Sequence, residues 1–288
     1  MLLFFAGFLG RRAGWLTPAH AGKMLQLVMT VGLPALFIAD VSRVPLSRAL
    51  AVLPVSAILI MLVTLATAWA IGHRLQLPRP TQGAFLLCST LLNPGFIYPF
   101  VLAAWGREAF AMLALFDLGH TLMLGTVMYA VAASYGGHAT GFAAIVRRVL
   151  SFPPLWALIG ALSLNLTDTQ LPSLVTTVLG TAGRLILLLV ILALGVLFNV
   201  RLLRSRLVVT ALALRIPLGL ALGLACAAVF GLTGLPRAAL LLGASAPIGF
   251  SAVVIANRES LDRDLAASAA SISVLLALFY VPLALWLL

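Results

Sequence analysis

Charged side chains are scarce in this chain, and acidic ones are the scarcest. Of 288 residues, 63% are hydrophobic, 9% are charged and only 7 are Asp or Glu. An ordinary soluble domain carries roughly 25% charged residues, so this composition excludes a soluble domain of ordinary surface. It predicts a membrane protein with several transmembrane helices.

Cysteines and the usual motifs of metal sites and enzymes are also missing. Cys88 and Cys226 are the only cysteines and lie in separate apolar segments, which excludes a disulfide framework and provides no metal-ligand spacing. We find no paired carboxylates for prenyl transfer, no His/Glu zinc motif, and no Ser and His spaced for intramembrane proteolysis. The sequence therefore predicts no enzyme, no metal and no cofactor.

Long hydrophobic runs are abundant. Nine runs are long enough to cross roughly 30 Å of hydrocarbon as helices, and a shorter run covers residues 1–10. The nine cover residues 22–41, 49–72, 82–105, 108–133, 150–165, 173–199, 207–231, 237–256 and 265–288. The N-terminal run has no basic region before it and no small-residue cleavage pattern, so we interpret it as a retained helix that is either truncated or begins upstream of Met1. The sequence thus predicts ten transmembrane helices.

The net charge of +11 reflects membrane topology, because the basic residues lie between the apolar runs and do not gather on one soluble face. No nucleic-acid partner is therefore expected. The links after the odd-numbered helices hold twelve basic residues: Arg11, Arg12, Lys23, Arg74, Arg79, Arg147, Arg148, Arg201, Arg204, Arg206, Arg258 and Arg263. Those after the even-numbered helices hold four: Arg43, Arg48, Arg107 and Arg237. The positive-inside rule places the first set in the cytoplasm and both termini outside. The arginine-rich composition suggests a bacterial protein, and hence a bacterial inner (plasma) membrane.

Two of the hydrophobic runs contain a proline at corresponding places in the two halves of the chain. They read FLLCSTLLNPGFIYPFVLAAW (85–105) and AALLLGASAPIGFSAVVIA (238–256). Proline removes a backbone donor and clashes with the preceding turn, which frees carbonyl groups that lipid cannot satisfy. Paired interrupted helices of this kind indicate the substrate site of a secondary transporter.

An internal repeat supports the same interpretation. Each interrupted run leads to a short charged turn and another helix, with Arg107-Glu108 in the first half and Arg263-Asp264 in the second, and residues 16–40 resemble 171–199 in pattern. Five helices are an odd number, so the second half enters the membrane from the opposite side. We predict inverted five-helix repeats over residues 1–133 and 150–288, joined by a cytoplasmic link at 134–149.

Four stretches resemble the auxin efflux carrier family. LLNPGFIYPFVLAAWGREAFAMLALFDLGHT (91–121) is similar to its fourth and fifth helices, and FPPLWALIGALSLNLT (152–167) to its sixth, with Phe152 where Asn is common. ALRIPLGLALGL (213–224) resembles the eighth helix, and APIGFSAVVIANRES (246–260) the ninth. The resemblance implies an all-α fold shared with bile acid sodium symporters. In that fold a scaffold of helices 1, 2, 6 and 7 lies beside a core of helices 3–5 and 8–10, and the broken helices 4 and 9 cross in the core. A homodimer through the scaffold helices stays open.

The resemblance and the helix breaks point to the same substrate-binding residues. Half-helices at a break present N-terminal ends that favour a carboxylate. The expected residues are Asn93, Pro94 and Gly95 at the first break and Ser245, Pro247 and Ser251 at the second. The alternative for the two serines is that their hydroxyls bond their own backbone. Ser251 stands where the family often has Asn.

Four ionisable residues fall deep inside predicted helices, away from the helix ends, where charge is costly. Asp117 and His120 share a helix face and could carry a proton or brace the neighbouring helix. Arg215 could neutralise Asp117 or meet an anionic substrate, and family resemblance favours charge balance within the core. Arg184 could contact substrate or anchor its helix at the outer boundary by snorkelling.

No acidic residue falls within either interrupted run, so a sodium site there is not expected. Proton coupling and uniport both stay open. The substrate implied by the resemblance is a small organic anion, either a dicarboxylate or an aromatic or aliphatic monocarboxylate. The alternatives are a cation/proton antiporter of related crossover fold and a carrier-like sensor that does not transport.

Overall fold

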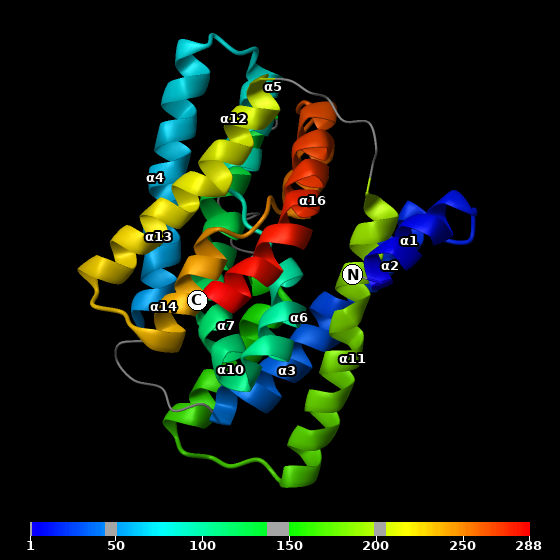
Figure 1. Ribbon diagram of the computed structural model, residues 1–288, viewed down its shortest axis with the longest axis vertical. Coiled ribbons are helices and arrows are strands. Elements are labelled where there is room, and N and C mark those ends of the chain that lie inside the picture. The colour runs from blue at the N-terminus through cyan, green and yellow to red at the C-terminus, as the bar shows by residue number, and fades with distance from the viewer. Residues whose placement is uncertain (1, 44–50, 137–149, 199–205) are drawn as a thin grey trace. The chain divides into compact units, whose positions relative to one another are not determined.

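The computed structural model describes residues 2–43, 51–136, 150–198 and 206–288, and over these ranges the chain is helical and contains no sheet (Figure 1). The first half contains α1 (Leu2–Arg12), α2 (Pro18–Leu27), η1 (Val28–Gly32), α3 (Leu33–Asp40), η2 (Val41–Arg43), α4 (Val52–Arg74), α5 (Arg79–Thr90), α6 (Pro94–Ala104), α7 (Gly106–Met123), η4 (Leu124–Met128) and α8 (Tyr129–Gly136). The second half contains α10 (Pro153–Leu166), α11 (Ser173–Leu197), α12 (Arg206–Arg215), α13 (Pro217–Val229), α14 (Gly234–Ala244), α15 (Phe250–Arg258) and α16 (Arg263–Leu287). The predicted link lies outside the described residues from 137 on, as do Arg48, Arg147, Arg148, Arg201 and Arg204.

Six helical stretches of the described chain are long and apolar enough to cross a membrane. They cover Pro18–Arg43, Val52–Arg74, Gly106–Gly136, Ser173–Leu197, Arg206–Val229 and Arg263–Leu287. Each coincides with one predicted run to within a few residues. The prediction of a multi-pass helical protein is confirmed.

The four remaining predicted runs form shorter helices. The N-terminal run forms α1 and the run at 150–165 forms α10, with 11 and 14 residues. Both proline-containing runs are divided: the first into α5 and α6, the second into α14 and α15. Pro94 and Pro247 therefore interrupt their helices fully, because each break contains extended residues between two separate helices.

The chain separates into two compact units. The first unit contains Met1–Arg48, Tyr98–Ala114 and Phe152–Phe198, and the second contains Ala49–Ile97, Leu115–Ser151 and Asn199–Leu288. The division falls within α6 and within α7, so these two helices contribute residues to both units.

In the first unit, α11 packs against α1, α2 and α3 (Figure 1). Glycines make the close approach of these helices possible. A Cβ added at Gly195 of α11 would overlap the carbonyl oxygen of Phe4 in α1, and one added at Gly183 would lie 2.7 Å from Cγ of Leu36 in α3. Arg11 donates to the carbonyl of Val196 at 2.9 Å and so satisfies part of the C-terminal end of α11.

In the second unit, α5 is surrounded by α4, α8, α12 and α16. Polar contacts join the ends of several helices at the N-terminal end of α5. Thr81 donates to Asp262 at 3.1 Å, the backbone N–H of Asp262 donates to Pro80 at 3.2 Å, and Arg79 donates to the carbonyl of Ser134 at 2.6 Å. Three links predicted to be cytoplasmic therefore meet at one end of this unit. Which side of the membrane that end faces stays a prediction.

Candidate functional site at two paired helix breaks

The two helix breaks lie side by side in the second unit. Residues 91–93 separate α5 from α6, and residues 245–249 separate α14 from α15. Leu92 pairs with Ile248 in an antiparallel bridge, and the N–H of Gly249 donates to the carbonyl of Leu91 at 3.0 Å. Gly249 fits this close approach because a Cβ there would overlap the carbonyl oxygen of Leu92. We call residues 91–93 and 245–249 the paired breaks.

Local sequence explains the first break. Pro94 occupies the first position of α6, where its missing N–H removes no helical hydrogen bond, and Asn93 caps the helix. The Oδ1 atom of Asn93 accepts from the N–H of Phe96 at 3.2 Å. Gly95, like Asn93, is partly exposed. The predicted residues Asn93, Pro94 and Gly95 thus form the N-terminal end of α6.

The second break is more deeply buried. Residues 245–249, which include Pro247, are all buried, whereas Ser251 in the first turn of α15 is partly exposed. The hydroxyl of Ser245 donates to the carbonyl of Leu241 in its own helix at 2.7 Å, which is the structural alternative considered for this serine. The N–H of Ile248 donates to the hydroxyl of Ser273 at 3.0 Å, so α16 also satisfies this break.

Arg215 holds the C-terminal ends of both interrupted helices. Its side chain is fully buried. Its Nη1 donates to Thr90 at the end of α5 at 3.1 Å, its Nη2 donates to Ala244 at the end of α14, and its Nε donates to Ala246 at 3.2 Å. A helix C-terminus carries a partial negative charge and unpaired carbonyls, so one guanidinium both neutralises and satisfies the two ends.

Three buried polar atoms beside the first break lack a hydrogen-bond partner among the residues that the structure describes. They are Ser89 Oγ, Thr90 Oγ1 and Asn93 Nδ2. Most buried polar atoms in native proteins are paired with protein or water, so this cluster is suited to water or a polar ligand. Ser89 and Thr90 were not predicted as site residues, although two hydroxyl residues four and three positions before Asn93 in an apolar run could have indicated them.

Asp117 and His120 lie together on α7, as their spacing predicts. Oδ1 of Asp117 is 2.8 Å from Nδ1 of His120, and His120 is 5% exposed. The Nε2 atom of His120 is buried with no hydrogen-bond partner in the described part of the chain. The pair can therefore hold a proton between its two members, and Nε2 can exchange one with a further group.

Comparison with known proteins identifies the family. A family model for membrane transport proteins matches residues 1–286. The chain belongs to this family, that of the auxin efflux carriers. An uncharacterized transporter of Methanothermobacter thermautotrophicus is 28% identical over 291 residues, which cover 98% of this chain and 94% of the relative. This protein is accordingly an integral multi-pass membrane protein.

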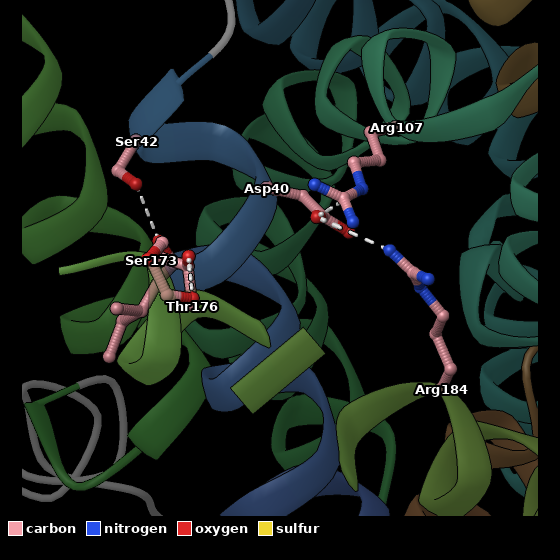
Figure 2. Close-up of polar contacts among 7 residues, drawn as sticks. Asp40, Ser42, Arg107, Ser173, Thr176 and Arg184 are labelled. Carbon is pink, nitrogen blue, oxygen red and sulfur yellow. Dashed lines mark hydrogen bonds and ion pairs between the residues drawn. The ribbon is translucent and has the colours of Figure 1, made fainter. Parts of the chain in front are cut away.

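Arg184, the remaining predicted site residue of this transporter, lies in the first unit, whereas the paired breaks belong to the second unit. Arg184 is on α11 in the first unit, with its Nη2 3.9 Å from Oδ1 of Asp40, and Nε of Arg107 is 3.3 Å from the same oxygen (Figure 2). Sequence reasoning missed Asp40. The sequence could have indicated it, because Asp40 is the only acidic residue among the first 107 residues and lies at the end of an apolar run.

Proposed function

We propose that this transporter is a secondary carrier that moves a small organic anion, a carboxylate, by alternating access at the paired breaks. One observation carries the proposal. Arg215 neutralises the C-terminal ends of α5 and α14, whereas no acidic residue belongs to either break to neutralise the N-terminal ends of α6 and α15. The breaks thus have an excess of positive potential, which a substrate carboxylate would complement.

Asn93 is the residue proposed to recognise the carboxylate most directly. Its Oδ1 caps α6, which leaves the buried Nδ2 as a free donor at the N-terminal end of the same helix. A hydrogen bond to a charged group contributes roughly 1.5–3 kcal/mol, so loss of this donor would weaken binding by roughly tenfold or more. Ser251, at the start of α15, is the proposed contact from the second break. Ser245 and Pro247 shape the break from its buried side.

The proposed fold has ten helices in two inverted repeats, with scaffold and core parts. Two features support it. The first unit contains the ranges expected as helices 1, 2, 6 and 7, which the family resemblance assigns to the scaffold, together with Tyr98–Ala114 from the expected core helices 4 and 5. The breaks pair through an antiparallel bridge, as two crossing helices with opposite directions would.

Transport is proposed to be independent of sodium, with a proton carried by Asp117 and His120 or with no coupling ion. The argument against sodium is that the breaks provide no carboxylate for a hard cation. The argument for a proton is the close pair within the span Gly106–Gly136.

Reconstituted liposomes with a panel of labelled organic acids test this function. Wild-type protein is expected to take up one class of anion saturably, without sodium, and Asn93→Ala is expected to weaken substrate binding, and so uptake at low substrate concentration, by roughly tenfold or more. Asn93→Asp separates the two roles of this residue. Its carboxylate can still cap α6, so stability is retained, but it provides no donor and repels an anion. Asn257→Ala, an exposed Asn on α15, is the matched control and should transport normally.

The buried Asp117–His120 pair also supports a second candidate function, a cation/proton antiporter. The same liposomes distinguish the two. Proton flux driven by sodium or potassium gradients, with no response to any organic acid, would establish the antiporter and reject the carboxylate carrier. Binding of an acid without flux of any kind would indicate a sensor.

A further inference from the structure

The first unit contains a cavity whose lining includes no residue of the paired breaks. Its volume is about 400 Å³, within the range of small-molecule sites. Its apolar walls come from α6 and α11 and consist of Pro99, Leu102, Ala103, Leu185, Leu187 and Leu188. Two charged side chains, Arg107 and Arg184, complete the lining. The cavity therefore has the character of an amphiphile site, with apolar walls and a cationic region.

Positive charges outnumber negative charges around Asp40. The carboxylate of Asp40 has no exposed surface and is shared by Arg107 at 3.3 Å and Arg184 at 3.9 Å, which approach it from different sides in Figure 2. One carboxylate between two guanidinium groups leaves one positive charge in excess. Each guanidinium has five N–H donors, and each ion pair to Asp40 involves a single nitrogen. Donors therefore remain for a second acidic group.

The backbone holds these side chains in place. Gly106, with φ of +77°, makes the turn from α6 into α7 and places Arg107 in the first turn of α7. On α11, Gly180 faces both Ala39 of α3 and Arg184, since a Cβ there would be in ordinary van der Waals contact, 3.7 Å from Cβ of Ala39 and 3.8 Å from Nη2 of Arg184. The packing of α3 against α11 thus fixes Asp40 and Arg184 relative to each other.

Two of the helices around the cavity, α7 and α11, belong to stretches that are long and apolar enough to cross a bilayer. Asp40 and Arg184 both lie in stretches that can span a membrane, where ionisable residues usually mark functional sites. Next to Arg184 on α11, Leu185 and Leu188 are 64% and 42% exposed. An apolar chain leaving the cavity would find these leucines directly beside the cationic region.

We propose that this cavity binds an acidic amphiphile, with one carboxylate or phosphate headgroup held between Arg107 and Arg184 and an apolar chain against Leu185 and Leu188. A simple inorganic anion would leave the apolar walls unused, and a cation would be repelled by the excess positive charge. The ligand could be an anionic membrane lipid or a free fatty acid, because both present the same headgroup chemistry. The inference is independent of which substrate crosses at the paired breaks.

Native mass spectrometry of the purified full chain tests this proposal. The probes are phosphatidylglycerol, phosphatidylcholine with the same chains, dodecanoate and inorganic phosphate. Phosphatidylglycerol or dodecanoate should remain bound, and the one that does identifies the source. Arg107→Gln and Arg184→Gln should each weaken binding roughly tenfold, as expected for loss of a charge-assisted hydrogen bond. Arg12→Gln, at an exposed arginine of the same unit, is the matched control and should bind as wild type.

Two further variants separate binding from general damage. Asp40→Asn removes the carboxylate that competes with the ligand headgroup for the two arginines, so it should tighten binding severalfold. Misfolding would weaken binding and could not produce this increase. Ala103→Leu narrows the cavity without changing charge and should weaken binding of the chain-bearing probes. The proposal is overturned if phosphatidylcholine binds as well as phosphatidylglycerol and dodecanoate does not bind, or if inorganic phosphate binds as tightly as either acid. Equal binding by Arg184→Gln and wild type also overturns it.

Discussion

Replacement of Arg215 by methionine tests whether one buried guanidinium organises both helix breaks. Methionine is apolar and flexible enough to fill much of the same space. It removes all three donors and leaves the carbonyls of Thr90, Ala244 and Ala246 without this partner. The carbonyls belong to the backbone, so no side-chain change can remove them along with the arginine.

The magnitude follows from these three bonds. A buried polar group left unpaired costs about 1–3 kcal/mol, and relief from burying the arginine charge offsets part of the total. We expect Arg215→Met to lower the free energy of unfolding by about 3–5 kcal/mol, or the melting temperature in detergent by roughly 10–15 °C. Arg215→Lys keeps the charge, but one ammonium cannot span three carbonyls, so roughly half the loss should remain.

Thermal unfolding in detergent and uptake into liposomes measure the two consequences. Leu53→Ala is the matched control, because Leu53 is fully buried in α4 of the same unit and its truncation costs about 2–5 kcal/mol. At equal loss of stability, Arg215→Met should reduce uptake at least tenfold more than Leu53→Ala. Wild-type stability in Arg215→Met would refute the hydrogen-bond argument. Equal uptake by the two variants would refute a role in arranging the breaks.

Three further outcomes follow from the structure. Gly195→Ala should destabilise the first unit by about 1–3 kcal/mol, because the added Cβ would overlap the Phe4 carbonyl. Gly160→Ala is the control: a Cβ there would have no neighbour within 4 Å, so this variant should be neutral or slightly stabilised. Thermal unfolding measures both. Ser245→Ala should change the substrate KM less than twofold, since its hydroxyl bonds its own helix, and a large rise would instead place it against substrate. Asp117→Asn should abolish acceleration of uptake by an imposed pH gradient but spare counterflow; persistent acceleration would exclude this residue from proton coupling.

The hydrophobic runs predicted most of the helical segments, since a helix that crosses lipid must be apolar over a known length. The runs around Pro94 and Pro247 were predicted to be interrupted, and each forms two separate helices. Hydropathy alone does not reveal the extent of such a break, because its freed backbone groups are satisfied by residues distant in sequence, such as Arg215 and Ser273.

Within the candidate site, the sequence located Asn93 and the Asp117–His120 pair from local spacing. It did not reveal that one atom of Asn93 caps α6 while another is left free, and it left open whether the Ser245 hydroxyl bonds its own helix, as it does. Whether any of these residues contacts substrate stays a prediction for the transport assays. Side-chain partners of this kind depend on rotamers that local spacing does not specify.

By itself the sequence determined that this is a multi-pass membrane transporter with two helices interrupted by proline. Composition is enough for the membrane assignment, because the bilayer restricts which backbone structures can span it, whereas the transporter assignment came from the paired interrupted runs and the family resemblance. Only the tertiary structure decided that Arg215 joins the ends of two helices from opposite halves of the chain, and that Asp40 lies between two arginines. The contacts of Arg215 with Thr90 and of Asp40 with the two arginines join residues more than 60 positions apart, so tertiary packing selects the partners.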